Sequence, residues 1–203
     1  MLKKARIAVL VSGGGTNLEA LLQAQEDGEI PHGEIVFVCA SNEQAYALER
    51  AKNHGVPSAA IPKRELSQDA FEERLNKYMK EYRIDLIILA GFLTILSEQF
   101  VKQWQNRIIN IHPSLIPSFC GKGMYGLKVH EAVLERGVQI TGATVHLVNE
   151  IPDGGTILLQ KAVSVRCDDT AEVLQRRVME EAEWILLPKA AEIMACQIIE
   201  NDF

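Results

Sequence analysis

The 203-residue sequence lacks the patterns that mark disulfide-rich, zinc-binding and membrane-spanning proteins. Its four cysteines form no CxxC pair, which favours free thiols in a reducing compartment. There is no HExxH motif and no Cys/His cluster, so we expect no metal site. No apolar run reaches the roughly 18–20 residues that a membrane-spanning helix needs, so we expect no membrane partner. The cysteines are Cys39, Cys120, Cys167 and Cys196.

An excess of positive charge is also missing. The chain contains 21 Lys and Arg against 27 Asp and Glu, a formal net charge of −6. Proteins that follow nucleic-acid phosphates usually carry a basic excess, so we expect no nucleic-acid partner, although a small anionic ligand needs only a local site. The first 15 residues lack a small-residue cleavage site and lead into a glycine loop, which predicts a strand rather than a signal peptide. We therefore expect a cytoplasmic protein.

Short apolar runs alternate with segments of helical periodicity along the whole chain. This alternation predicts a single domain, residues 1–203, with a three-layer α/β fold. Its twisted sheet is expected to be mostly parallel and covered by helices on both faces, with antiparallel strands toward the C-terminal part. The expected strands cover residues 6–11, 34–40, 56–61, 85–90, 107–111, 144–148 and 157–165, and the expected helices cover residues 17–25, 43–53, 68–82, 97–103 and 169–199, the last interrupted at Pro188.

A glycine-rich stretch, SGGGTN at residues 12–17, joins the first expected strand to the first expected helix. Glycines let the backbone approach a ligand, and the N–H groups of a helix start favour an anion. The stretch therefore predicts either a phosphate-binding loop or a plain strand-to-helix turn. It lacks the third glycine of a dinucleotide fingerprint, because Leu18 stands there, and it lacks the Gly-Lys-Ser/Thr of a P-loop.

Asn110 and His112 stand two residues apart at the end of a buried strand, before a long loop expected at residues 113–128. Alternate residues of a strand share a face, and Pro113 restricts His112 to an extended conformation. The pair is thus expected side by side at the carboxyl end of a strand, where open α/β sheets bind ligands. An amide and an imidazole there can stabilise an oxyanion and exchange a proton, although a polar pair can also merely end a strand.

Asp153 precedes two glycines in an expected turn. An aspartate there is often only a turn former, and its functional alternative is to orient His112 and hold it protonated. We expect His32, His54 and His130 at the surface or near helix ends, and His146 as a structural histidine of the core.

Four segments carry a resemblance to a known family: residues 9–21 (VLVSGGGTNLEAL), 89–97 (LAGFLTILS), 110–119 (NIHPSLIPSF) and 141–160 (TGATVHLVNEIPDGGTILLQ). In them the chain resembles the phosphoribosylglycinamide formyltransferases, folate-dependent enzymes of purine synthesis with a Rossmann-like formyltransferase fold. The resemblance implies transfer of a formyl group from 10-formyltetrahydrofolate to the amine of glycinamide ribonucleotide. It implies small-molecule partners, no metal, and a monomer or a homodimer.

The resemblance also assigns roles to individual residues. Asn110, His112 and Asp153 match the family's catalytic residues. The ribonucleotide-binding residues are matched by Gly15, Thr16, Asn17 and Glu183. The folate-binding residues are matched by Gln68, Leu93, Thr94, Ile95, Leu96, Asn110 and Glu150.

Three departures concern the folate tail and the neighbouring loop. Thr94 and Gln68 stand where familiar members often carry a basic residue, and residues 119–128, which include Cys120, form a longer loop than in many members. Cys120 is an alternative nucleophile, but no base is paired with it in the sequence.

Three other functions remain open at this point. Methionyl-tRNA formyltransferase shares the HPSLIP motif but needs basic surface or a second domain for tRNA. Formyltetrahydrofolate hydrolase carries an N-terminal regulatory domain that this sequence does not show. A non-catalytic sugar-phosphate binding module would use only the glycine loop.

Overall fold

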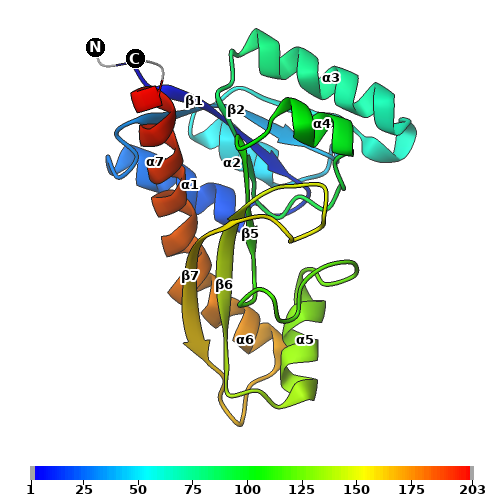
Figure 1. Ribbon diagram of the computed structural model, residues 1–203, viewed down its shortest axis with the longest axis vertical. Helices are drawn as coiled ribbons and strands as arrows, with labels where there is room; N and C mark the ends of the chain where they lie inside the picture. The colour runs from blue at the N-terminus through cyan, green and yellow to red at the C-terminus, as the bar shows by residue number, and fades with distance from the viewer. Residues whose placement is uncertain (1–2, 202–203) are drawn as a thin grey trace.

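The computed structural model describes residues 3–201 and contains one seven-stranded sheet in the order β3-β2-β1-β4-β5-β6-β7. The strands from β3 to β5 are parallel, whereas β5, β6 and β7 pair antiparallel, as the sequence predicts. Figure 1 shows β6 and β7 extending below the parallel part of the sheet. The strands are β1 (Ala5–Val11), β2 (Gly33–Ala40), β3 (Ser58–Ala60), β4 (Leu86–Leu89), β5 (Ile108–His112), β6 (Ile140–Leu147) and β7 (Ile157–Ser164).

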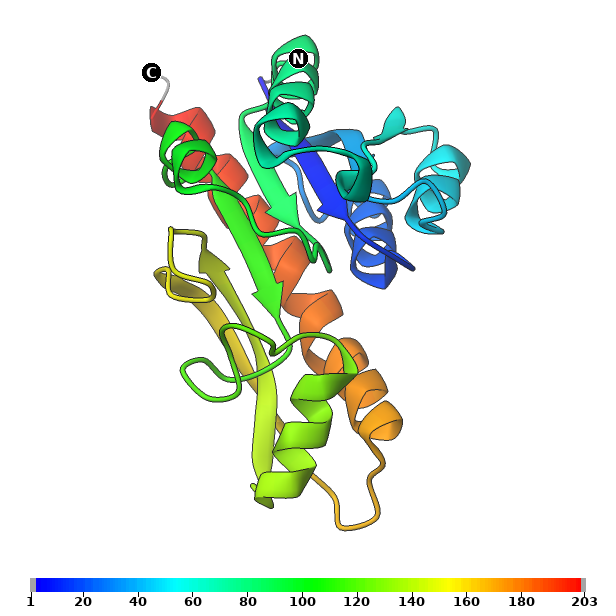
Figure 2. The same ribbon diagram turned by 90° about the vertical axis from the view of Figure 1, so that its right-hand side faces the viewer.

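Helices cover both faces of this sheet, which confirms the three-layer α/β fold. In Figure 2, α7 passes behind β5 and runs along one face of the sheet. The helices are α1 (Thr16–Glu26), α2 (Ala47–Asn53), η1 (Lys63–Glu65), α3 (Gln68–Glu81), α4 (Glu98–Gln103), α5 (Leu127–Arg136), α6 (Ala171–Val178), η2 (Met179–Glu183) and α7 (Trp184–Asn201).

The hydrophobic core consists of two clusters, one on each face of the sheet. Ile7 and Val9 of β1 belong to the cluster packed against α1, α2 and α7, whereas Ala8 and Leu10 belong to the cluster packed against α3 and α4. Alternate residues of a strand point to opposite faces, so a strand buried on both sides reads as one continuous apolar run. The apolar runs that predicted the strands therefore reflect burial on both faces.

Two expected helices differ from their predictions. α2 begins at Ala47 rather than at residue 43, because Asn42 forms a turn in which its side-chain oxygen accepts a hydrogen bond from the Gln44 N–H at 2.9 Å. The expected interruption at Pro188 is wrong, because α7 continues through this residue. The irregularity is instead the π-helical turn η2, directly before α7. A proline lacks the N–H that closes a helical turn, and a wider turn upstream accommodates it without ending the helix.

No helix within residues 3–201 has the length and apolar character that crossing a bilayer requires.

Candidate active site

The candidate site begins at the carboxyl end of β5, where Asn110 and His112 lie on one face of the strand. The strand pairs with β4 as far as Asn110 and with β6 as far as His112, and these pairings fix the backbone of both residues. His112 is only 4% exposed, whereas Asn110 is partly exposed. This placement agrees with the position predicted from the sequence.

Asp153 lies in the loop between β6 and β7, and its carboxylate faces one histidine of β5 and one of β6. Its Oδ2 lies 3.6 Å from Nδ1 of His112, and its Oδ1 lies 3.5 Å from Nε2 of His146. The Gly121 N–H donates a hydrogen bond to Oδ2 at 2.8 Å. Burial raises the pKa of Asp153, but the His146 hydrogen bond, the charge of His112 and the Gly121 N–H outweigh it and hold this pKa below its ordinary value. Asp153 is therefore a carboxylate that faces two imidazoles.

The loop that carries Asp153 is shaped by its neighbours. Asp153 itself has a left-handed backbone with φ of 57°, a conformation that aspartate tolerates better than most residues. A Cβ at Gly155 would collide with the carbonyl oxygen of Leu147, so only glycine fits there. The Asn149 side chain closes the loop, because its Oδ1 accepts from the Ile151 N–H and its Nδ2 donates to the Gly154 carbonyl. The Asp-Gly-Gly sequence is thus a requirement of this tight path.

His146 belongs to the site, a placement that the sequence pattern alone does not reveal. Its Nδ1 lies 2.8 Å from the Leu147 carbonyl oxygen, and because a carbonyl only accepts, Nδ1 donates. Its Nε2 lies 3.1 Å from the Asn110 amide nitrogen and 3.5 Å from Asp153 Oδ1. Without a proton Nε2 accepts from Asn110, and with a proton it donates to Asp153. In either state the Asn110 amide keeps an N–H for a ligand. The signal for this role is the register, because His146 pairs directly with Asn110 across β5 and β6.

The long loop after β5 covers His112. The Nε2 of His112 lies 2.9 Å from the Phe119 carbonyl oxygen, so Nε2 carries a proton and donates it to this loop. The loop ends at Gly126, two residues before the expected boundary, where α5 begins.

His130 contradicts the expectation of a surface or capping position. It lies on the buried face of α5 and is fully buried, because this face packs into the protein interior. Burial, together with the nearby charge of His112, lowers the pKa of His130 to about 4, so it is neutral at physiological pH. The other two histidines lie closer to their predicted positions. His32 is partly exposed and pairs with Glu192, whereas His54 is largely covered and pairs with Glu19 and Glu26.

The glycine loop lies at the N-terminus of α1, as predicted. Gly15 is the N-cap residue, with φ of 72°, and a Cβ there would collide with Ala47. No side chain caps this helix start, so its N–H groups are open to a ligand. Thr16 contacts the sulfur of Met179 at 3.7 Å, which links the loop to η2.

Glu183 in the π-helical turn η2 faces the same loop. Asn17 Nδ2 donates a hydrogen bond to Glu183 Oε2 at 2.7 Å. Burial raises the pKa of Glu183 to about 7, although the Asn17 hydrogen bond works in the opposite direction. The structure thus brings together Asn17 and Glu183, two predicted ligand-binding residues 166 positions apart.

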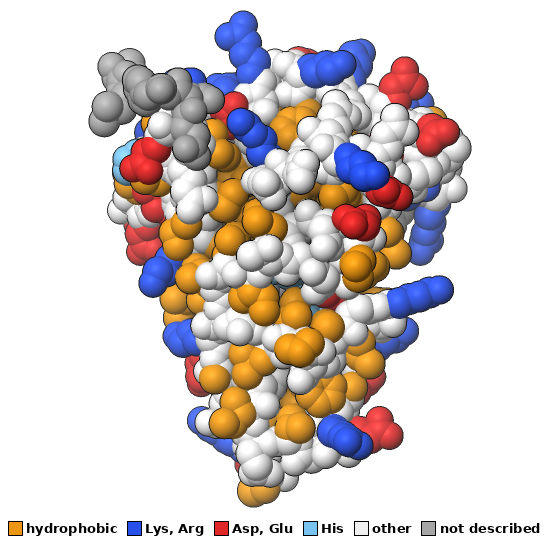
Figure 3. Space-filling model, viewed as in Figure 1, with side chains coloured by type: hydrophobic (Ala, Val, Ile, Leu, Met, Phe, Trp, Pro, Cys, Tyr) orange, Lys and Arg blue, Asp and Glu red, His pale blue; other side chains and the backbone are white. Residues whose placement is uncertain are grey.

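Several predicted folate-binding residues line an apolar cavity of about 120 Å³ next to Asn110 and Asp153. Two large apolar side chains at its mouth are exposed, Ile95 at 68% and Ile151 at 59%. Figure 3 shows a hollow in the middle of this face, with histidine and acidic side chains at its bottom and hydrophobic side chains around it. Such exposed apolar side chains beside a cavity are typical of a ligand-binding site. The predicted residues that line it are Thr94, Ile95, Leu96, Asn110, Glu150 and Asp153.

Two other predicted folate-binding residues lie beside this cavity. Leu93 lines a second cavity of about 460 Å³, and Thr94 lines both. Gln68 donates hydrogen bonds from its amide nitrogen to Glu72 and to the Ile95 carbonyl.

The alternative of Cys120 as a nucleophile finds no support here. Burial and the charge of Asp153 raise the pKa of the Cys120 thiol, which makes it a poorer nucleophile. Within residues 3–201, no three His, Cys, Asp or Glu side chains are grouped so that they could hold a metal ion.

Comparison with known proteins points to one family. Residues 5–190 match the family model described as formyl transferase. The chain is 39% identical to the crystal structure of glycinamide ribonucleotide transformylase 1 from Symbiobacterium toebii, with a TM-score of 0.87, and the match covers 95% of this chain and 88% of that one.

Two curated relatives are longer than this chain. It is 40% identical to the chloroplastic phosphoribosylglycinamide formyltransferase of Arabidopsis thaliana over 88% of this chain and 62% of that protein. It is 41% identical to the trifunctional purine biosynthetic protein adenosine-3 of Gallus gallus over 97% of this chain and 19% of that protein.

The raised pKa of Glu183 predicts a pH-dependent stability. Between its ordinary pKa of 4.5 and about 7, the folded chain retains a proton on Glu183 that the unfolded chain releases. The free energy of unfolding therefore falls as the pH rises through this window, by up to about 3 kcal/mol from this group alone. Glu183→Gln should lack this component, which urea unfolding of both proteins at pH 5 and pH 8 will show. An identical pH dependence in the two proteins would contradict the buried, protonated state of Glu183.

The close approach of the Leu147 backbone to Gly155 predicts that any side chain at residue 155 destabilises the fold. Gly155→Ala should lower the free energy of unfolding by at least about 2 kcal/mol, because its Cβ meets the Leu147 backbone. Gly14→Ala is the matched control for stability, because a Cβ at Gly14 meets nothing within 4 Å. Chemical denaturation measures both variants, and equal stability of the two would contradict the packing described for the Asp153 loop.

Proposed function

The chain belongs to the formyl transferase family, and from this premise we propose that it transfers the formyl group of 10-formyltetrahydrofolate to the amine of glycinamide ribonucleotide. The products are formylglycinamide ribonucleotide and tetrahydrofolate. The observation that carries the proposal is the meeting of Asn110, His112 and Asp153 between the glycine loop and the apolar cavity. The glycine loop offers N–H groups to an anion, and the cavity offers apolar surface to a flat ring system. The three polar side chains lie between them.

The polar side chains supply the chemistry. The amine attacks the formyl carbon and forms a tetrahedral oxyanion, which the free N–H of Asn110 stabilises. His112 contributes its Nε2 proton once it exchanges the hydrogen bond to the Phe119 carbonyl for one to the formyl oxygen. The negative charge of Asp153, 3.6 Å from Nδ1 of His112, stabilises positive charge that develops on this ring during the reaction. Collapse of the intermediate breaks the bond between the carbon and N10, and the proton lost by the amine is gained by N10.

The ribonucleotide is assigned to the glycine loop. Its phosphate would accept hydrogen bonds from the backbone at Gly15, Thr16 and Asn17, with the positive end of the α1 dipole behind them. Glu183 lies under this loop, where it can accept a hydrogen bond from the glycinamide group. In this assignment the phosphate of the ribonucleotide lies at the glycine loop, and the amine of the same molecule points toward the end of β5.

The formyl donor is assigned to the apolar cavity. Ile95 and Leu96, with Leu93 from the adjoining cavity, would contact one side of its ring system, and Glu150 belongs to the loop on the other side. We further propose that residues 1–203 act as one formyltransferase domain, as a monomer or a homodimer, in the cytoplasm.

One assay separates this function from its rivals. The protein is mixed with 10-formyltetrahydrofolate, with and without glycinamide ribonucleotide, and the release of tetrahydrofolate is followed. Release that requires the ribonucleotide supports the proposal. Release without it identifies a hydrolase, and ribonucleotide binding without release identifies a binding module. Formylation of methionyl-tRNA in a parallel reaction would favour the tRNA enzyme, which the net charge of −6 disfavours.

The proposed roles predict large losses of rate in three variants. Asn110→Ala, His112→Ala and Asp153→Asn should each lower kcat for formyl transfer by at least about 10²-fold, the typical cost of one oxyanion donor. His32→Ala is the matched control, because His32 is partly exposed and its side chain pairs with Glu192, which is not part of the candidate site. Steady-state kinetics on folded protein measure all four, and a near-normal kcat in His112→Ala would overturn the mechanism.

A further inference from the structure

Residues 91–97, which we call the donor segment, connect β4 to α4 without regular helix or strand structure. The segment carries Leu93, Thr94, Ile95 and Leu96, the four consecutive residues assigned to the formyl donor. Leu93 and Ile95 are 60% and 68% exposed, so packing of these side chains does not hold the backbone in place. A segment with neither regular hydrogen bonds nor buried side chains at these positions needs other anchors.

The anchor at its C-terminal end is a buried carboxylate. Glu72 of α3 is 8% exposed, and its Oε1 accepts hydrogen bonds from the Ser97 N–H and from Gln68 Nε2, both at 2.6 Å. Its Oε2 accepts from the Ser97 hydroxyl at 2.5 Å. The same hydroxyl accepts from the Phe100 N–H and so caps α4. Glu72 therefore fixes both the end of the donor segment and the start of the next helix.

Gln68 extends this anchor by one step along the chain. Its amide nitrogen donates to Glu72 and also to the Ile95 carbonyl at 3.1 Å. Glu72 thus reaches the backbone at residue 97 directly and the backbone at residue 95 through Gln68. These positions flank Leu96 and include Ile95, which both line the apolar cavity.

A second anchor holds the other end of the donor segment. The Leu93 N–H donates to the Ser12 hydroxyl at 2.9 Å, and the Ser12 and Ser41 hydroxyls lie 2.7 Å apart. Ser12 belongs to the first glycine loop, so this contact ties the donor segment to the loop assigned to the ribonucleotide. Because hydrogen bonds hold both ends of the donor segment, its conformation depends on the residues that make them.

The chemistry of Glu72 indicates more than packing of α3 against α4. An apolar side chain would fill this position without the cost of removing a carboxylate from water. The hydrogen bonds that the carboxylate accepts come from Ser97 of the donor segment and from Gln68, which itself binds the segment. Hydrogen bonds to a charged acceptor are the stronger and shorter kind, suited to fixing a loop.

We propose that Glu72 is a positioning residue for the formyl donor: through Ser97 and Gln68 it holds the donor segment in the conformation that binds the folate. The inference rests on the proposed function, because it takes 10-formyltetrahydrofolate as the ligand of the cavity. Glu72 itself is buried and does not line the apolar cavity. Its loss should weaken donor binding and leave ribonucleotide binding intact.

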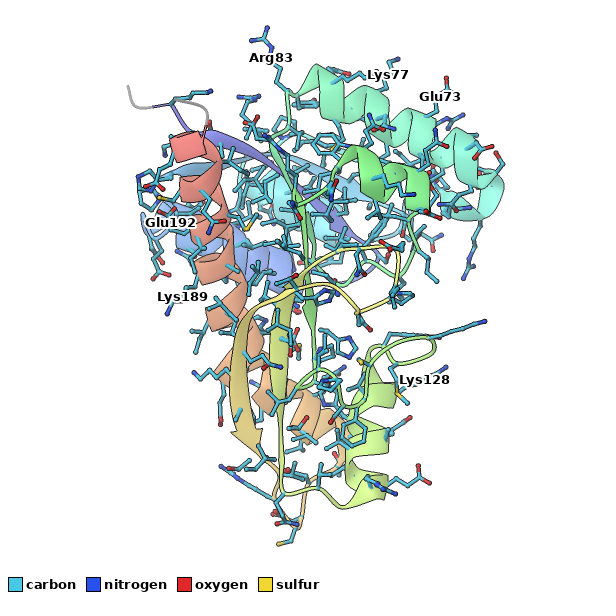
Figure 4. The ribbon with its side chains drawn as sticks, viewed as in Figure 1. Glu73, Lys77, Arg83, Lys128, Lys189 and Glu192 are labelled. Carbon is cyan, nitrogen blue, oxygen red and sulfur yellow. The ribbon has the colours of Figure 1, made fainter. Side chains whose placement is uncertain are left out.

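The test compares two variants of Glu72 with a neighbouring control. Glu72→Ala removes every acceptor, whereas Glu72→Gln keeps one acceptor oxygen and should recover part of the effect. Glu73→Gln is the matched control, because Glu73 projects from the exposed side of the same helix, as does Lys77 (Figure 4). For each protein, KM is measured for both substrates together with kcat, and the folded fraction is measured by circular dichroism.

We expect Glu72→Ala to raise KM for 10-formyltetrahydrofolate by roughly tenfold, the scale of a lost hydrogen bond to a charged group. Glu72→Gln should fall between Glu72→Ala and the unchanged Glu73→Gln, and KM for the ribonucleotide should stay within about twofold of the parent value.

Two results would overturn the inference. A purely structural role would lower the active fraction, and hence the apparent kcat, without a rise in the donor KM. Failure of both Glu72 variants to fold would likewise assign Glu72 to the fold. If the parent protein itself transfers no formyl group, the proposed function fails first, so the two failures are distinct.

Discussion

The candidate site depends on one carboxylate. Asp153 reaches back from the loop between β6 and β7 to His112 on β5 and His146 on β6, and it accepts a hydrogen bond from Gly121 in the loop after β5. Three segments are thereby held around one negative charge in a partly buried place. Their arrangement determines the rest: His146 contacts the Asn110 amide, and His112 is held with a proton on the nitrogen that faces the covering loop. Without this charge, two imidazoles and an amide would lie close together with no carboxylate between the rings to balance a positive charge on either of them.

The fold supplies what the carboxylate needs. The parallel strands place the glycine loop and the end of β5 at the same edge of the sheet, and the antiparallel hairpin of β6 and β7 carries Asp153 to that edge. The C-terminal helices bring Glu183 under the glycine loop from the far end of the sequence. The candidate site is thus built from segments that are distant in sequence, and the two proposed substrates would meet where these segments converge.

Several of these features could be predicted from the sequence because they depend on local rules. The pairing of Asn110 with His112 follows from the two-residue period of a strand, and the glycine loop follows from its composition. The contact of Asp153 with His112 could not be predicted, because it depends on how β6 is aligned with β5. The same alignment places His146 opposite Asn110, so a residue that reads as part of the core belongs to the site. Glu72 reads as an ordinary helix residue, because only the folding of α3 over the donor segment reveals its partners.

The central claim is that Asp153 and His112 act as a unit in formyl transfer. A double-mutant cycle with His112→Ala, Asp153→Asn and the combined variant tests it most directly, with kcat/KM for formyl transfer as the readout. If Asp153 acts through His112, the double variant will be about as slow as the slower single variant. If the two losses multiply, so that the double variant shows the product of the single effects, the residues act independently and the account is contradicted.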